Sequence, residues 1–216
     1  MTESAATAPA TTFAALLWPR RSGTTAIARA MFLAILGACL LTVSAKVQVP
    51  GPVPMTLQTL AVMAIGAALG LRLALAAVAI YLVQGALGLP VFANTPPMAP
   101  GVAYFLGPTG GFLLGFAMAA GMVGAAADRG LMERPLLFAI ALTAANVVLL
   151  AIGCAWIALF AKTASGVSGL GFGRAFELGV KPFLAGNAIK LALAAIAFPL
   201  IYDSIARLVR RGTPGA

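Results

Sequence analysis

The 216-residue sequence has little charge and no histidine. Lys, Arg, Asp and Glu together make up 9% of the chain, against roughly 25% in a soluble globular domain. The lack of histidine excludes His-based metal sites and His-dependent catalytic triads. The acidic residues are scattered over the tail, the connections and the ends of apolar runs: Glu3, Asp128, Glu133, Glu177 and Asp203. They build no nucleophile–base pair or metal cluster, so we predict that the protein is not an enzyme and uses no cofactor or metal.

Two features of energised transporters are also missing. The sequence has no GxxxxGK[ST] phosphate-binding loop, so the chain cannot itself use ATP. No carboxylate lies within an apolar run, where a proton-coupled carrier usually has one. These absences favour a small binding bundle that draws its energy from partner proteins.

What the sequence has instead is apolar surface. It is 62% hydrophobic with a mean hydropathy of +1.03, and its apolar runs are continuous rather than alternating, which predicts membrane helices and not a barrel. We predict an all-α membrane protein, a bundle of six transmembrane helices, at residues 26–44, 55–70, 73–88, 110–127, 135–161 and 182–206. A tight turn at Gly70-Leu71-Arg72 would separate the second span from the third. Residues 1–19 are predicted to be a disordered tail, 20–211 the membrane domain and 212–216 a C-terminal tail.

The basic residues punctuate the apolar runs, as membrane topology requires, and do not form a nucleic-acid surface. With six spans, one side of the membrane carries Arg20, Arg21, Arg29, Arg72, Arg129, Arg134, Arg207, Arg210 and Arg211. The other side carries Lys46, Lys162, Arg174 and Lys181. This bias predicts a multi-pass protein of the plasma (inner) membrane with both termini in the cytoplasm.

Lys190 is the most informative residue, because it lies inside the last apolar run. A lysine at mid-membrane costs about 2.5–3.5 kcal/mol on insertion scales, so it normally faces a protein interior or a water-filled cavity. Asn187, three residues earlier, shares its helix face. An ammonium attracts a carboxylate, and a side-chain amide offers a donor and an acceptor. We therefore predict that this face binds an anionic, hydrogen-bonding solute, the alternative being a lysine that reaches the lipid headgroups.

Further uncommon polar residues fall in the outer half of the predicted bundle. Thr56, Gln58 and Thr59 begin the second span, and Asn94, Tyr104 and Thr109 belong to the long, uncharged, proline-rich connection 89–109. Connections of that length without their own secondary structure are usually functional. A pocket open to the outside and closed by proline-stiffened loops is the simplest arrangement of these groups.

Two local patterns have structural interpretations of their own. Thr109, in Gly107-Pro108-Thr109-Gly110-Gly111, is a good N-cap for the fourth span. Ala26, Ala30 and Ala34 form a small-residue stripe on the first span, which would let another helix approach closely.

Three stretches, in this order, closely resemble the BioY family, the biotin-specific S components of energy-coupling factor (ECF) transporters. They are PVPMTLQTLAV at residues 52–62, GALGLPVFA at 85–93 and LGPTGGFLLGF at 106–116. PFLAGNAIK at residues 182–190 is similar to a fourth family pattern, Pro-x-x-x-Gly-Asp-x-x-Lys. The resemblance spans roughly residues 26–206. Asn187 stands where the family usually has Asp, and Phe112 where it often has Tyr.

The resemblance implies a six-helix fold that captures biotin near the outer surface and passes it inward. It implies partners: a transmembrane coupling protein, which the alanine stripe would contact, and two cytoplasmic ATPases. The biotin-binding residues expected from it and from the polar pattern are Lys190, Asn187, Asn94, Tyr104, Thr109, Gln58, Thr56 and Phe92. The sequence leaves three other functions open: an S component for another vitamin, a self-sufficient secondary carrier, and a membrane-embedded structural or assembly factor that binds no small solute.

Overall fold

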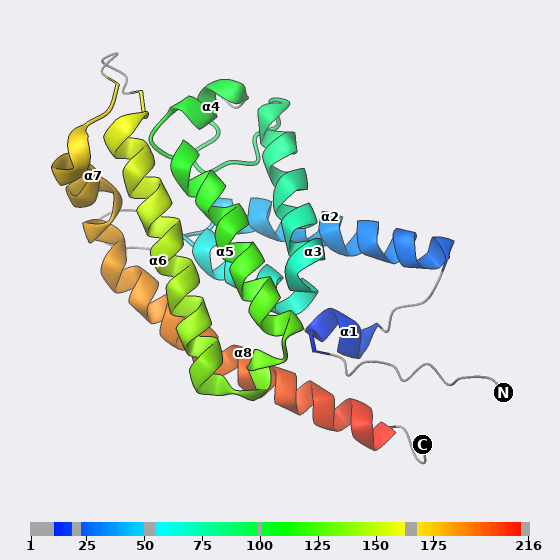
Figure 1. The fold of residues 1–216 in the computed structure, drawn as a ribbon. Helices are drawn as coiled ribbons and strands as arrows, with labels where there is room; N and C mark the ends of the chain where they lie inside the picture. Colours follow the sequence, from blue (N-terminus) through cyan, green and yellow to red (C-terminus); the bar gives the residue numbers. More distant parts are fainter. Residues whose placement is uncertain (1–10, 19–22, 50–54, 99–100, 163–167, 213–216) are drawn as a thin grey trace.

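The structure is a computed structural model, and it describes residues 11–18, 23–49, 55–98, 101–162 and 168–212. Its elements, in chain order, are α1 (Phe13–Leu17), α2 (Thr24–Lys46), β1 (Gln48–Val49), β2 (Met55–Thr56), α3 (Gln58–Ala86), α4 (Val102–Leu106), α5 (Gly110–Asp128), η1 (Leu131–Glu133), α6 (Pro135–Leu159), α7 (Gly171–Gly179), η2 (Lys181–Phe183) and α8 (Leu184–Gly212). Figure 1 shows a helical bundle with one two-stranded ribbon, β1–β2.

Five helices are long and apolar enough to cross a membrane, within the part of the chain that is described: α2, α3, α5, α6 and a segment that includes α8. The predicted spans 26–44, 110–127, 135–161 and 182–206 are confirmed to within a few residues, except that α8 continues to Gly212. The predicted spans 55–70 and 73–88 both fall within α3, which accounts for five candidate spans where six were predicted.

The boundary between those two predicted spans is a sharp break at Gly70. Its φ of 76° and ψ of 176° are non-helical, and the ribbon changes direction there (Figure 1). Only glycine adopts this conformation without strain, and a Cβ at this position would lie 2.2 Å from Asp128 Oδ1. Asp128, the last residue of α5, accepts a hydrogen bond from the Leu71 N–H at 2.9 Å, so it satisfies a donor that the break leaves free. The three-residue turn expected from the sequence is thus a one-residue break held by a neighbouring helix.

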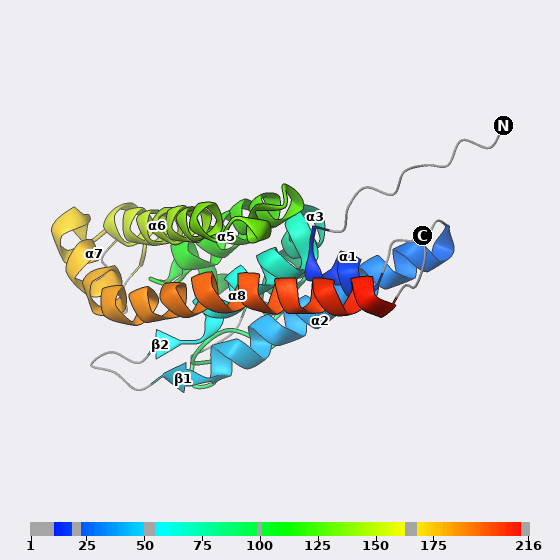
Figure 2. The ribbon, with the colours of Figure 1, turned by 90° about the horizontal axis from the view of Figure 1, so that it is seen from below.

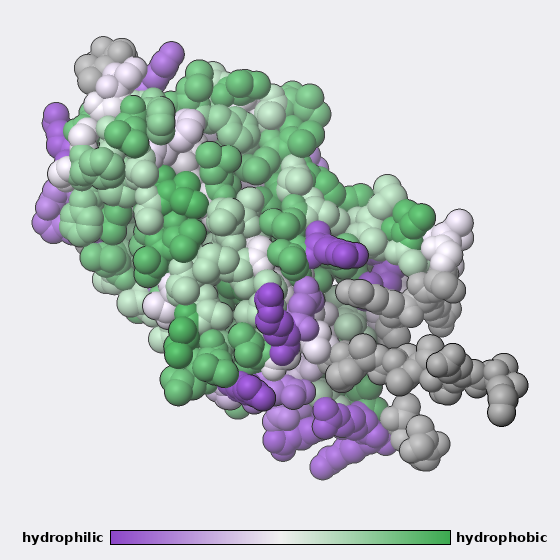
Figure 3. All heavy atoms as spheres, in the orientation of Figure 1, coloured by the Kyte–Doolittle hydropathy of each residue, from purple (hydrophilic) through white to green (hydrophobic). Residues whose placement is uncertain are grey.

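The two halves of α3 and the helix α5 form the centre of the bundle. Fully buried side chains such as Val62, Tyr81 and Val123 come from these helices, with Phe138 from α6. Figure 2 shows α5 and α6 on one side and α2 on the other, with α8 running between them in that view. Large apolar side chains cover the outer surface (Figure 3), as expected of a lipid-facing one.

The C-terminal part of the alanine stripe of α2 faces the bundle and not a partner protein. Ala34 is 3% exposed and Ala38 is fully buried, because this face packs on α3. A Cβ added at Gly37 would lie 2.7 Å from Ala77 Cβ. The exposed face carries larger residues, among them Ile27, Met31, Phe32, Ile35 and Leu36. Ala34 therefore cannot contact a coupling protein in this arrangement, and Ala26 and Ala30 are half-buried.

The predicted N-terminal tail contains an ordered element. Residues 1–10, 19–22 (with Arg20 and Arg21) and 213–216 lie outside the described residues, but α1 packs its Phe13 edge-on against Tyr202 of α8 at 5.7 Å. Arg29 of α2 donates a hydrogen bond to the Ala14 carbonyl at 2.6 Å. These contacts join the start of the described chain to α2 and α8.

Hydrophilic residues gather at two places on the face in Figure 3, around the end of α8 and around α7, with apolar surface between them. The end near α7 also holds the ribbon β1–β2 (Figure 2).

Candidate functional site

A cavity of about 230 Å³ lies inside the bundle, on the side of the ribbon β1–β2. Residues from all the main helices except α2 line it: Met55, Thr56, Gln58, Thr59, Tyr81, Ala93, Asn94, Tyr104, Thr109, Phe112, Leu113, Phe116, Leu149, Leu150, Phe183, Asn187 and Lys190. Seven of the eight residues predicted to bind a ligand are in this set. The cavity therefore brings together groups that are up to 134 residues apart in the chain.

Lys190 points into the bundle from α8 and is 6% exposed. Its ammonium donates to the Thr56 carbonyl at 2.7 Å and to Thr59 Oγ1 at 3.2 Å. An ammonium has three N–H donors, so one of them has no acceptor among the described residues. No acidic residue is among the described residues that line the cavity. The positive charge is thus solvated by neutral oxygens and has a donor left for an anionic or carbonyl group.

Asn187 extends this network by one turn of α8. Its Oδ1 accepts from Thr59 Oγ1 at 3.3 Å, and its side chain is 4% exposed. Because that oxygen is used within the protein, Asn187 can offer its amide N–H groups to a ligand. Lys190 and Asn187 do share one helix face, as their spacing predicted.

A second pair lies on α3, across the Gly70 break. Gln58 Nε2, in the first half, donates to the Tyr81 hydroxyl in the second half at 2.7 Å. Thr56 Oγ1 donates to Gln58 Oε1 at 3.3 Å. Tyr81 was not predicted as a site residue. The signal was available, since a buried tyrosine hydroxyl in an apolar span needs a partner.

The roof of the cavity comes from the connection between α3 and α5. Asn94 has a positive φ of 55°, and its Oδ1 accepts from Gln48 Nε2 at 3.2 Å. The Tyr104 hydroxyl donates to the Ala93 carbonyl at 2.9 Å. Burial raises the pKa of the Tyr104 phenol, which keeps it neutral and able to donate.

Thr109 lines the cavity, but it is not the helix cap that was also predicted. It does precede α5, but its backbone is in the right-handed helical region and its side chain makes no capping hydrogen bond. Its Oγ1 is buried and makes no hydrogen bond of normal geometry with the described residues, although it lies near enough to the Tyr104 hydroxyl to offset part of the rise in that phenol's pKa. A buried hydroxyl without a partner is costly, and this one lines the cavity, so a ligand group could satisfy it.

Phe92 is the predicted site residue that does not line the cavity. It is fully buried behind the roof, and its ring is stacked on Tyr104 at 4.6 Å and edge-on to Tyr81 at 5.3 Å. Gly85 makes room for it, because a Cβ there would lie 2.0 Å from the Phe92 ring. Phe92 thus supports two lining tyrosines. Sequence could not separate a lining aromatic residue from one packed behind it.

The chemistry of the cavity is asymmetric. Phe112, Leu113, Phe116, Leu149 and Leu150 supply an apolar wall, and amides, hydroxyls and one ammonium lie opposite. This arrangement suits a compact solute with an apolar body, a hydrogen-bonding group and a negative charge. Phe112 belongs to this apolar wall and adds no hydroxyl to it.

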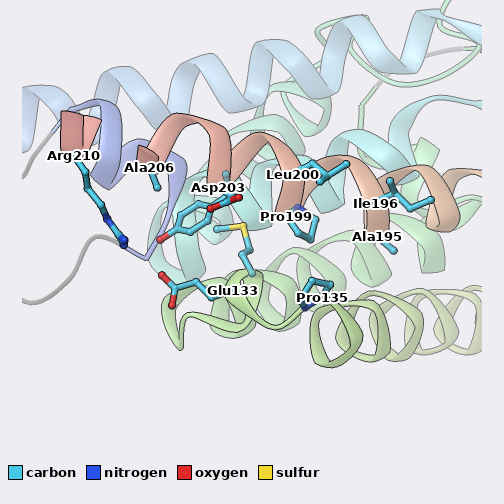
Figure 4. Close-up of a pocket in the computed structure, with 11 residues that line it drawn as sticks. Glu133, Pro135, Ala195, Ile196, Pro199, Leu200, Asp203, Ala206 and Arg210 are labelled. Carbon is cyan, nitrogen blue, oxygen red and sulfur yellow. The ribbon is translucent and has the colours of Figure 1, made fainter. Parts of the chain in front are cut away.

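A larger groove of about 630 Å³ opens between η1, the start of α6 and the second half of α8. Figure 4 shows α8 residues, among them Pro199 and Ala206, on one wall and Glu133 and Pro135 on the other. Asp203, Glu133 and Arg210 are its charged residues, and Asp203 is paired with Arg207. Its charged residues are mixed in sign, and neither a buried ammonium nor a buried side-chain amide is among the described residues that line it, so we assign the candidate site to the smaller cavity.

Comparison with known proteins finds relatives that are named as biotin transporters. Relatives include a probable biotin transporter BioY of Pyrococcus horikoshii, 38% identical over 78% of this chain and 93% of its own length. The biotin transporter BioY of Rhizobium etli is 38% identical over 67% of this chain and 75% of its own length, and BioY2 of Lactococcus lactis is 32% identical over 76% and 85%.

The fold is also that of a solved protein. The crystal structure of the S component for biotin from an ECF-type ABC transporter matches with a TM-score of 0.68, covering 85% of this chain and 95% of that one at 18% identity. The model of the BioY family matches residues 11–207, and the chain belongs to the BioY family.

Proposed function

We propose that the protein is the biotin-binding S component of an ECF-type vitamin transporter, a transport protein and not an enzyme. Family membership supports this function, as does the name biotin transporter that the relatives carry. The observation that carries it is the buried Lys190 with an unused N–H donor beside an apolar wall. Biotin has a carboxylate, a ureido group and an apolar body, which are the features that this cavity can accommodate.

The proposed topology has six passages, with the two halves of α3 counted separately. The hydrogen bond from Leu71 to Asp128 brings Arg72 to the same end as Arg129 and Arg134, the end that the positive-inside rule assigns to the cytoplasm. The cavity then opens toward the outer face of the inner membrane, and both termini lie inside.

The proposed partners are a transmembrane coupling protein and two cytoplasmic ATPases, in a lipid bilayer. The coupling protein would meet the exposed face of α2, which carries large apolar residues along its length, with Ala26 and Ala30 at its edge. Ala30→Trp is expected to spare biotin binding and to prevent co-purification with the coupling protein. Co-purification that survives the change would argue against α2 as the contact.

The function is tested by titrating the purified protein with biotin, with thiamine and riboflavin as competitors. Tight binding of biotin that neither competitor reduces is expected, and selective binding of another vitamin would contradict the proposal. Uptake by cells with and without the ECF ATPases then separates an S component from a self-sufficient carrier. Uptake that needs no ATPase and follows a proton gradient would favour the carrier.

A further inference from the structure

Lys46, the last residue of α2, makes hydrogen bonds that no sequence pattern suggested. Its ammonium donates to the Phe92 carbonyl at 2.7 Å, to the Thr95 carbonyl, and to Thr95 Oγ1 at 3.2 Å. All three N–H donors of the ammonium are therefore used. All three acceptors belong to one turn of the connection between α3 and α4.

That turn, residues 92–95, forms part of the roof of the candidate site. Its first and last residues, Phe92 and Thr95, are 0% and 2% exposed. The two residues between them, Ala93 and Asn94, line the cavity. Lys46 thus holds both ends of the segment whose middle faces a bound solute.

Without Lys46, the Thr95 carbonyl would lose its donor within the described part of the chain. Thr95 Oγ1 also donates to the Phe92 carbonyl at 2.6 Å, but no other donor to the Thr95 carbonyl is found among the described residues. Hydrogen bonds to a charged group are stronger than neutral ones. Loss of the ammonium would therefore loosen the turn without removing any residue of the cavity.

A second contact reinforces the connection to α2. Gln48, two residues beyond Lys46, donates to Asn94 Oδ1 at 3.2 Å. Asn94 has a positive φ, a conformation that costs free energy unless surrounding contacts hold it. The end of α2 and the strand after it therefore fix the orientation of a cavity-lining amide.

We propose that Lys46 is a positioning residue that latches the roof turn 92–95 to the end of α2 and so slows release of the bound solute. The inference rests on the proposed function only for the identity of that solute, biotin. Because the latch connects the roof to α2, a movement of α2 against the bundle would be transmitted to the roof.

The test compares Lys46→Met, which keeps the length and removes the charge, with Lys46→Arg and with Lys162→Met. Lys162 is an exposed lysine near the same loops, and its backbone N–H, not its ammonium, bonds to Leu106. Lys46→Met is expected to raise the dissociation rate of radiolabelled biotin about tenfold with a smaller change in the association rate. Lys46→Arg should recover part of the effect, and Lys162→Met should behave as the wild type.

Hydrogen exchange of the ligand-free protein gives a second readout that does not require biotin. Lys46→Met should speed exchange of the Thr95 and Met98 amides, which bond within the roof, and leave the amides of α5 unchanged. Unchanged exchange at these positions would overturn the latch, as would an unchanged release rate or a uniform loss of stability. A wild-type protein that binds no biotin would instead overturn the proposed function, and the exchange experiment would still decide the latch.

Discussion

The cavity beneath the roof turn and the groove beside η1 share two helices, α6 and α8, yet they differ in size and chemistry. The groove has a volume of about 630 Å³ and the cavity about 230 Å³. The cavity, however, has a buried ammonium, two buried side-chain amides and a hydroxyl without a partner. Buried polar groups are costly unless something satisfies them. The comparison teaches that buried polar groups, and not volume, are the reason to place the candidate site in the cavity.

The largest effect on biotin affinity is expected when the charge is removed from the cavity. Lys190→Met should weaken biotin binding by about 100-fold, since a charged hydrogen bond in a buried site contributes about 1.5–3 kcal/mol. The ligand-free protein should remain folded, because the change also removes a buried charge. Titration by calorimetry and a thermal melt without biotin measure the two effects. Unchanged affinity would remove Lys190 from the site.

A smaller effect is expected from Thr109→Val, a change of nearly the same shape. Biotin affinity should fall about threefold to tenfold, the contribution of a neutral hydrogen bond. The melting temperature of the ligand-free protein should stay the same or rise, because a buried hydroxyl without a partner is removed. Thr143→Val is the matched control, since Thr143 is exposed on α6 and its hydroxyl bonds only within its own helix. A lower melting temperature with full affinity would show that Thr109 has a structural role.

Phe112→Tyr adds a polar group to the apolar wall of the cavity and so tests whether further polar chemistry there strengthens binding. The new hydroxyl would restore the group that the family often has at this place, and biotin should bind about threefold more tightly if it reaches the ligand. Equilibrium binding measured beside the wild type decides this. Weaker binding would mean that the wall at Phe112 must stay apolar.

The smallest effect is expected in the groove. Leu200 lines the groove and is 61% exposed, and Leu200→Trp places a bulky indole ring there. Biotin affinity should stay within about twofold of the wild type, because distant sites act independently. Affinity that falls as far as in Lys190→Met would assign the site to the groove instead.

The helices and the polar residues of the cavity could be predicted from sequence, because continuous apolar runs and a lysine within one of them are strong signals. The direction in which a helix faces could not. The apolar residues of α2 serve both a lipid surface and the contact with α3, so composition did not reveal that Ala34 and Ala38 point inward. Of the predicted stripe, Ala34 is thus covered by α3, whereas Ala26 and Ala30 stay at the edge of the exposed face.

Long-range contacts account for the remaining differences. The break at Gly70 was expected from the sequence, but the hydrogen bond from Leu71 to Asp128, which stabilises it, joins residues 57 positions apart. Lys46 reaches acceptors 46 and 49 positions away, and nothing local marks its partners. Thr109 had the residue type and position of a cap, and only the three-dimensional arrangement shows that its hydroxyl is not used for one.

The bond from Lys190 to the Thr56 carbonyl has one more consequence. It ties the last helix to the short strand ahead of α3, and Asn187 adds a tie through Thr59. A ligand bound among these groups would add contacts between the C-terminal helix and the rest of the bundle. On heating, α8 should separate first from the ligand-free protein. The ligand-bound protein should instead unfold in a single cooperative transition.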